Sequence, residues 1–177
     1  DADQTNGFAC LVITNGGFLV CSNDSSSAYL RVGYDGFQVT VADETGTIDV
    51  APTNQLDIAC TILFPLATGG HGRLSYGSDP DLNGWGIVNL WSNGVLEARS
   101  VEADGDSTNY NGIFNFRGGL LRTRTNYSTT LMSGLTNATV YEGGTIEVIS
   151  NATVSLNQDI GDGGLGGGLT KIGLGTL

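Results

Sequence analysis

Hydrophobic and polar residues alternate in short runs through the second half of the chain, and one such run recurs at nearly constant spacing. Four units begin with glycine and continue with alternating side chains, at residues 94–98, 119–123, 144–148 and 168–172. The first three start at equal intervals, and the fourth starts one position early. Alternation with a period of two is typical of a half-buried strand. The spacing predicts one such strand per coil of a β-solenoid, with about 25 residues in each coil. The third and fifth residues of each unit would point inward.

The charged residues of these units support the same alignment. The fourth position reads Glu97, Arg122, Glu147 and Lys171, so its sign alternates from unit to unit. Stacked strands lie about 4.8 Å apart, and opposite charges on neighbouring strands stabilise a sheet by a few tenths of a kcal/mol each. We therefore expect one outward column of alternating charge.

A second glycine-led unit precedes the first in each coil, at residues 86–90, 112–116 and 134–138. It places Asn89, Asn115 and Asn137 in corresponding positions. Inward asparagines on successive coils bond one another's amides in a ladder. Turn or surface asparagines are the alternative interpretation, especially for Asn137, which also begins an Asn-x-Ser/Thr sequon.

The N-terminal half carries the same kind of pattern with looser spacing. Short alternating runs predict strands at 8–13, 17–21, 29–33, 36–41 and 46–50, and the most apolar run, 56–64, predicts a buried strand or a short helix. Coil starts at Gly17, Gly46 and Gly72 are less evenly spaced than the later ones. We expect one all-β domain, a parallel β-helix of roughly seven coils, irregular over 1–71 and regular over 72–177.

Composition narrows the possible partners. The chain has 28 glycines and 3 prolines in 177 residues, and 7 basic against 18 acidic residues give a net charge of −11. An acidic chain lacks the clustered Lys and Arg that bind nucleic acid or anionic membranes. No apolar run is long enough to span a membrane. The chain begins at Asp1 without a leader-like segment, so we expect any signal peptide to have been removed from a secreted or cell-surface protein.

The cysteines and the Asn-x-Ser/Thr sequons are compatible with an extracellular protein. Of Cys10, Cys21 and Cys60, the first two lie on consecutive expected strands and are the favoured disulfide pair. Three buried free thiols are the alternative. With no Cys/His cluster, no zinc or haem site is expected. Sequons that a glycosylating source would modify begin at Asn23, Asn126, Asn137 and Asn151.

Two acidic turns provide the sharpest ligand hypothesis. Asp79 and Asp81 precede Asp104 and Asp106 by the same interval that separates the repeated units, so neighbouring coils would stack four carboxylates at one edge. Calcium favours such oxygen clusters. Solvated acidic turns are the alternative, and a glycosidase-like carboxylate pair is a third interpretation. The only histidine, His71, has glycine neighbours instead of an acid or a nucleophile, so we assign no catalytic residue and no cofactor beyond calcium.

Three aromatic residues indicate a second candidate binding surface, one for sugars. Trp85 and Tyr110 are separated by the same interval and, with Trp91, would form a strip on which sugar rings stack. Side chains that simply cover the coil are the alternative.

Residues 167–177 read Gly-Gly-Leu-Thr-Lys-Ile-Gly-Leu-Gly-Thr-Leu. This segment resembles the start of the autotransporter-associated β-strand repeat of bacterial secreted passenger proteins. The resemblance implies a right-handed parallel β-helix displayed at the cell surface, and a segment of a longer chain. It carries no catalytic residue onto this sequence.

Two functions follow as hypotheses. The first is a non-enzymatic extracellular structural module, such as a β-helical stalk, an adhesin or a self-assembling fibre subunit. Its partners would be further copies added end to end, other surface proteins or glycans, because open strand edges pair readily. The alternative is a polysaccharide-degrading β-helix protein that uses the acidic turns, or a polysaccharide-binding one that uses the aromatic strip.

Overall fold

The computed structural model contains strands and turns but no helix in the residues it describes. These are 18–20, 26–32, 38–43, 47–50, 55–59, 61–63, 73–76, 84–103, 110–123 and 129–177. Side chains are described for 57–59, 86–102, 112–123 and 130–177.

The strands form three sheets, named here A, B and C, and each is given in its spatial order. Sheet A contains β1 (Phe18–Val20), β6 (Thr61–Leu63), β9 (Val95–Ala98), β12 (Leu120–Thr123), β15 (Gly144–Glu147) and β18 (Leu169–Ile172). Sheet B contains β16 (Val154–Asn157), β13 (Thr129–Ser133), β10 (Ser100–Ala103), β7 (Arg73–Tyr76), β4 (Thr47–Val50), β2 (Ser26–Val32) and β3 (Gln38–Asp43). Sheet C contains β17 (Ile160–Asp162), β14 (Asn137–Val140), β11 (Tyr110–Arg117), β8 (Gly84–Trp91) and β5 (Gln55–Ile58).

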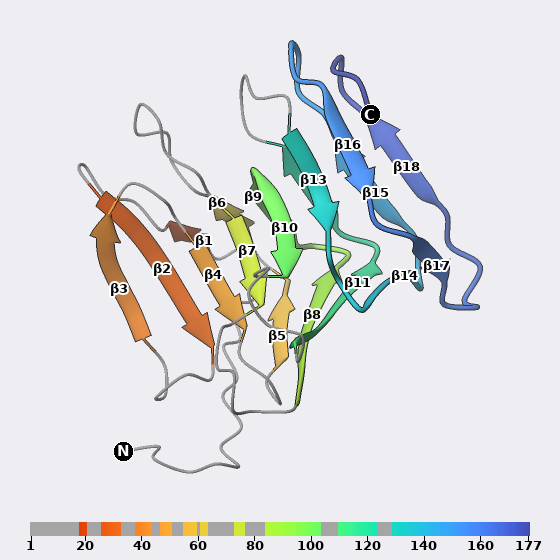
Figure 1. Cartoon of the computed structure of the whole chain (residues 1–177). Coiled ribbons are helices and arrows are strands. Elements are labelled where there is room, and N and C mark those ends of the chain that lie inside the picture. The colour runs from red at the N-terminus through yellow and green to blue at the C-terminus, as the bar shows by residue number, and fades with distance from the viewer. Residues whose placement is uncertain are drawn as a thin grey trace.

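The chain visits these sheets in a fixed order. From β5 to β16 it passes through sheets C, A and B in turn, and from β7 on each strand pairs in parallel with the strand one circuit earlier (Figure 1). The all-β prediction is confirmed, and the parallel stacked strands are compatible with a β-solenoid. Among the named strands, only β3 runs antiparallel to its neighbour, β2, and it forms the N-terminal edge of sheet B.

A single apolar core lies between the sheets. Along β9 and β12 partly buried and buried side chains alternate, as the period of two predicted. Leu96, Leu121 and Ile146 are fully buried and lie opposite one another on successive strands. The largest buried side chains, Phe114 and Phe116, meet edge to face with ring centroids 5.0 Å apart. The inward column of the repeated unit thus builds the core.

The glycine that begins each unit stands at the corner between sheets C and A. A Cβ on Gly94 would collide with the carbonyl oxygen of Ile58, and one on Gly144 would lie 2.8 Å from Cβ of Phe116. Real Cβ atoms essentially never approach other atoms so closely. Ile58, Leu90 and Phe116 form one register column of sheet C. The corner glycines therefore recur because each packs on the sheet C strand of the preceding coil.

The last repeat departs from the predicted alignment by one residue. The sequence pattern matched Gly168 with Gly144, but the structure pairs Leu169 with Gly144 and so keeps the interval of the earlier repeats. A slip of one residue exchanges the two faces of a strand. Lys171 therefore lies opposite Ile146 instead of Glu147, and Ile172, expected inside, is 43 % exposed.

The corner position itself differs in the last coil. The sheet C residue in register with Phe116 is Val140, which is smaller. The corner position of the last coil is Leu169, whose side chain packs against the core. The glycine spacing misled the sequence alignment because the glycine that lacks room for a Cβ here is Gly167, beside the backbone of Gly143, while Gly168 has open space around it.

The apolar run 56–64 also differs from expectation. It contains two strands, β5 in sheet C and β6 in sheet A, with the corner between Ile58 and Thr61. A continuous apolar run gives no signal of a corner when both flanking strands face the same core.

We predict that Gly144→Ala lowers the free energy of unfolding by about 1 to 3 kcal/mol, because the ring of Phe116 must move to admit a Cβ. Gly168→Ala is the matched control, since a Cβ there meets no atom within 4 Å and costs no stability. Urea unfolding followed by circular dichroism measures both variants. Equal losses for the two would contradict the corner packing.

Candidate functional site

A line of polar side chains crosses sheet C on its outer face. This polar ladder consists of Asp57, Asn89, Asn115 and Thr139, which pair in register on β5, β8, β11 and β14. The residues on either side of the asparagines, such as Val88 and Phe116, are fully buried in the core. Consecutive side chains of a strand point to opposite faces, so the asparagines point away from that core. The predicted ladder between Asn89 and Asn115 is confirmed, but the prediction that these side chains point inward is wrong.

Hydrogen bonds run along the ladder in one direction. Asn115 Nδ2 donates to Asn89 Oδ1 at 2.8 Å, and Asn89 Nδ2 donates to Asp57 Oδ1 at 2.8 Å. Trp91 Nε1 donates to the same Asp57 oxygen at 3.0 Å. Donors aligned toward one carboxylate polarise and strengthen each other. The ladder is thus a structural link between three coils, with its negative charge at the N-terminal end.

The ladder ends at Thr139, and Asn137 lies outside it. Asn137 is exposed and pairs with Ile113, while Asn115 pairs with Thr139. The unit 134–138 was misaligned because Gly134, with φ of 72°, and Leu135 precede the strand, which begins at Asn137. Because a threonine lies opposite Asn115, its Oδ1 has no hydrogen-bond partner in the described residues. This oxygen is buried, and the Asn115 residue as a whole is only 7 % exposed.

Two residues further along each strand, a second column covers the ladder. This cation–aromatic stack consists of Trp91, Arg117 and Tyr141. The guanidinium carbon of Arg117 lies 5.0 Å from the ring centroid of Trp91 and 4.4 Å from that of Tyr141. Arg117 Nε also donates to Asn89 Oδ1 at 3.4 Å. All three side chains are partly exposed, so the stack forms the solvent-facing surface of the site.

The charged column of sheet A brings together three of its four expected members. Arg122 Nε lies 2.6 Å from Glu147 Oε2, and Arg122 Nη1 lies 3.9 Å from Glu97 Oε2. Lys171 is not in this column; its Nζ donates to the carbonyl oxygen of Gly173 at 2.9 Å. The column therefore ends at Glu147.

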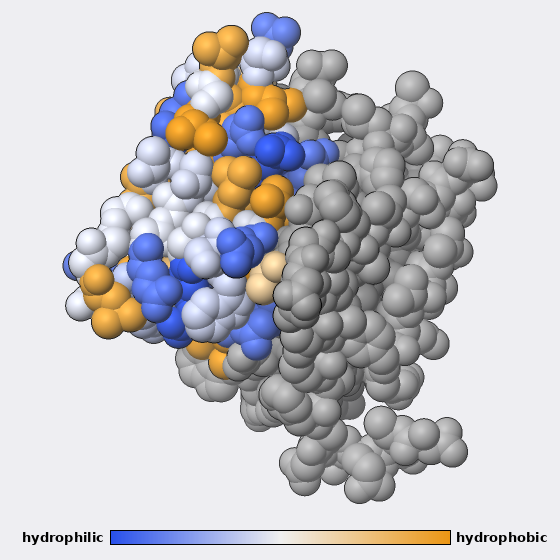
Figure 2. Space-filling model, turned by 180° about the vertical axis from the view of Figure 1, so that it is seen from behind, coloured by the Kyte–Doolittle hydropathy of each residue, from blue (hydrophilic) through white to orange (hydrophobic). Residues whose placement is uncertain are grey.

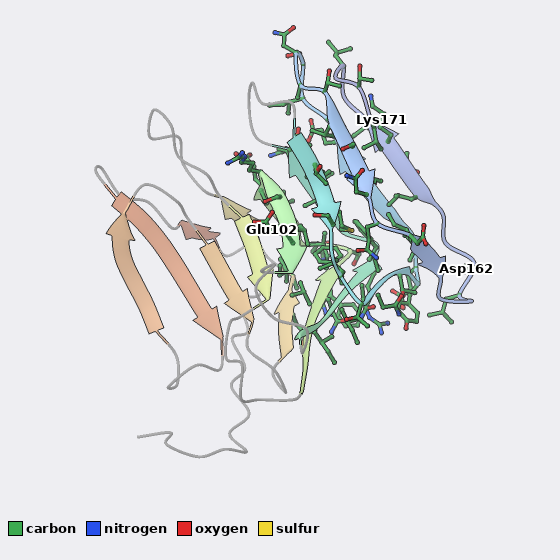
Figure 3. All side chains as sticks on the ribbon, in the orientation of Figure 1. Glu102, Asp162 and Lys171 are labelled. Atoms are coloured by element: carbon green, nitrogen blue, oxygen red, sulfur yellow. The ribbon has the colours of Figure 1, made fainter. Side chains whose placement is uncertain are left out.

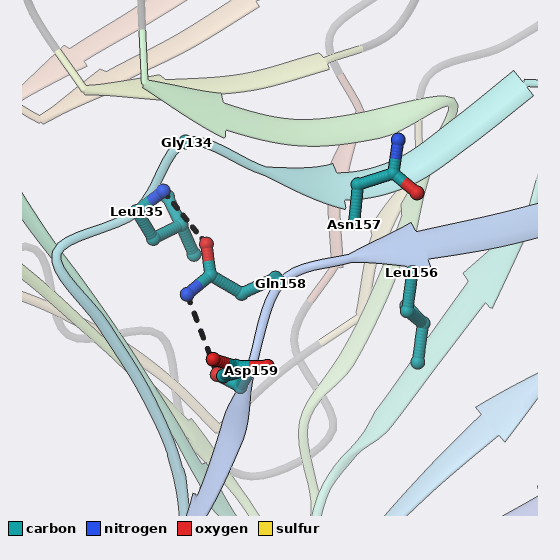
Figure 4. A pocket seen from close by; sticks show the side chains of 6 residues that line it. All are labelled: Gly134, Leu135, Leu156, Asn157, Gln158 and Asp159. Atoms are coloured by element: carbon teal, nitrogen blue, oxygen red, sulfur yellow. Dashed lines mark hydrogen bonds between the residues drawn. The ribbon is translucent and has the colours of Figure 1, made fainter.

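An open depression of about 470 Å³ lies where sheets B and C meet near the C-terminal end (Figure 4). Gln158 spans part of it, accepting from the N–H of Leu135 at 2.8 Å and donating to the carbonyl oxygen of Asp159 at 3.3 Å. Its lining holds no nucleophile beside a base, so the depression offers no catalytic arrangement.

Several predicted site residues lie outside the described part of the chain. These are Cys10, Cys21 and Cys60, the acidic residues Asp79, Asp81, Asp104 and Asp106, and the sequon residues Asn23 and Asn126. Asn151, which is exposed, has a φ of 69°. The backbone of sheet C pairs Trp85 with Asn111 and Tyr110 with Gly84, so the two aromatic residues are offset by one position instead of opposite each other.

Within the described residues, no group of three or more His, Cys, Asp or Glu side chains is placed to hold a metal ion. Nor does this part of the chain contain a helix long and apolar enough to cross a membrane. No family model, curated protein or solved structure matches the chain. The resemblance of residues 167–177 to the autotransporter-associated repeat therefore stays a prediction.

We predict that Thr139→Asn extends the polar ladder and raises the free energy of unfolding by about 1 kcal/mol, because the new amide can donate to the unpartnered Asn115 Oδ1. Thr145→Asn, on the outer face of sheet A, is the matched control and should bring no such gain. Thermal and urea unfolding compare the two. A gain shared by both variants, or a loss for Thr139→Asn, would contradict the proposed pairing.

We predict that Arg122→Glu destabilises the fold by about 1 kcal/mol at low salt, because it aligns three carboxylates on neighbouring strands. The loss should shrink in 0.5 M NaCl, where the Debye length is about 4 Å. Lys171→Glu makes the same change in net charge outside the column and should cost less. Melting temperatures at two salt concentrations test this, and a loss insensitive to salt would argue against the charge column.

Proposed function

We propose that the chain is a non-enzymatic structural module, a parallel β-helix of the surface-stalk, adhesin or fibre type, which associates end to end with further copies of itself. The observation that supports this best is the open C-terminal edge of sheets A and C. Strands β18 and β17 terminate these two sheets, and no strand pairs with their outer sides in the described residues. In sheet B, by contrast, Thr176 pairs with Thr153 beside β16, and its carbonyl oxygen accepts from the N–H of Val154. Unpaired strand edges are templates for β-strand addition.

Exposed apolar side chains gather at the same end. The large apolar residues that are most exposed in the described part of the chain all fall in the last coil: Leu165, Ile172, Leu174 and Leu177. Leu174 alone is 90 % exposed. Figure 3 places Lys171 and Asp162 on the two last strands at the edge of the molecule, and Figure 2 shows apolar side chains at the margin of the described surface. A further coil stacked on this end would remove such side chains from water.

We further propose the number and the hand of the coils. Roughly seven coils would arise if the strands before β5 complete further turns of the same kind. A right-handed coil follows from the strong preference of parallel crossover connections for that hand. We assign the module to the outside of the cell, on the basis of its acidic, glycine-rich composition and of residues 167–177, which resemble a passenger repeat.

We predict that Lys171→Pro abolishes end-to-end association while leaving the monomer folded. The N–H of Gly144 donates to Gly168 and that of Val148 donates to Ile172, so the Lys171 N–H between them faces the free edge of β18. Proline removes that donor and is tolerated at a strand edge. Lys171→Ala keeps the N–H and is the matched control.

Size-exclusion chromatography with light scattering over a hundredfold range of concentration measures this association. Larger species in the wild type and Lys171→Ala, but not in Lys171→Pro, are expected. A wild-type chain that remains monomeric over the whole range would contradict self-assembly.

A further inference from the structure

Arg117 is held in a fixed position on the outer face of sheet C, yet it has no acidic partner among the described residues. Its guanidinium lies between the rings of Trp91 and Tyr141, and its Nε donates to Asn89. No carboxylate in this part of the chain forms an ion pair with it. In contrast, Arg122 lies between two glutamates. The two Nη groups of Arg117 are therefore available to an external acceptor.

The fixed geometry lowers the cost of binding. An arginine normally loses side-chain freedom when it pairs with a ligand, but stacking on two rings has already restricted this one. A planar guanidinium presents parallel N–H donors that match a carboxylate in two-point contact. Asn115 beneath it is only 7 % exposed, and its Oδ1 lacks a partner in the described residues. The stack thus presents cationic donors, while the unpartnered Asn115 oxygen is buried and lies out of reach of a ligand.

The groups beside Arg117 indicate which carboxylate fits. Trp91 and Tyr141 remain partly exposed on either side of the guanidinium, and aromatic surface of this kind packs against the C–H faces of sugar rings. A uronate carries its carboxylate directly on such a ring. An acidic peptide carries it on a flexible stem, with no ring for the aromatic side chains. A nucleic acid is bound through clustered Lys and Arg side chains that contact successive phosphates, whereas this stack contains a single basic residue.

We propose that the cation–aromatic stack of Trp91, Arg117 and Tyr141 is a binding site for uronate-containing polysaccharides, in which Arg117 holds the carboxylate and the aromatic side chains contact the sugar rings. This site is independent of the assembly proposed above, because it lies on the outer face of sheet C and not at the strand edges.

The probe is a short oligogalacturonate, titrated into the ¹⁵N-labelled full chain, with the neutral oligogalactoside and sodium acetate as comparisons. Trp91 Nε1–H, identified by its loss in Trp91→Phe, reports on the site because it bonds to Asp57 beside the stack. We expect a saturable shift of this resonance with the uronate oligomer, and a much weaker response to the neutral sugar or to acetate.

Arg117→Gln should weaken oligogalacturonate binding at least about tenfold, the loss expected for a charge-assisted two-point contact. Arg117→Lys keeps the charge but loses the planar fork, and should recover only part of the affinity. Arg122→Gln removes an equal charge elsewhere and should leave binding unchanged, and circular dichroism verifies the fold of each variant.

The proposal would be overturned if the wild-type chain bound the neutral sugar or acetate as tightly as oligogalacturonate, or if Arg117→Lys bound oligogalacturonate as tightly as the wild type. A loss of affinity in Arg122→Gln equal to that in Arg117→Gln would also overturn it. So would the absence of any shift at millimolar oligogalacturonate. If Arg117→Gln fails to fold, the Arg117→Lys titration and the comparison of the three ligands decide the matter. Self-association can fail in solution without affecting any of these outcomes.

Discussion

Close approach of the backbone at the corner between sheets C and A is the constraint on which the rest of the structure depends. At Gly94 and Gly144 a strand turns so tightly over the preceding coil that a side chain would strike its backbone or the Phe116 ring. This contact fixes where one coil rests on the next and holds the strands of sheet A in a constant register. Once that register is set, apolar residues meet in the core, and Arg122 meets a glutamate on each side. The corner packing is thus the cause of both the core and the charge column.

The same stacking explains the organisation of the outer surface. Because strands repeat in register, identical or complementary polar groups fall in lines, and the asparagines of β8 and β11 bond each other and Asp57. A ladder of this kind satisfies polar groups that would otherwise be costly under the covering residues Trp91 and Arg117. Its last acceptor, on Asn115, is left open where threonine replaces asparagine in the column. Structural regularity and a potential ligand surface therefore have the same origin, and neither depends on a catalytic group.

Much of the architecture could be predicted from the sequence, because glycine-led alternation repeats with the coil. The inward column of Leu96, Leu121 and Ile146 and the pairing of Arg122 with its two glutamates follow from that period. The register of the last coil could not be predicted, because Leu169 occupies the corner position where the earlier coils have glycine, and Lys171 is then paired with Ile146. The stack around Arg117 escaped the sequence pattern because Trp91, Arg117 and Tyr141 are unevenly spaced along the chain and chemically unlike. A basic residue between two aromatic ones, in the register of the asparagines, is the signal that could have revealed it.

We propose that the chain is a structural module whose coils continue from one molecule to the next at their open ends. Negative-stain electron microscopy of the purified chain, over a series of protein concentrations, tests it most directly. The account predicts elongated particles that lengthen along the stacking axis as the concentration rises. Short particles of one constant length at every concentration would contradict it.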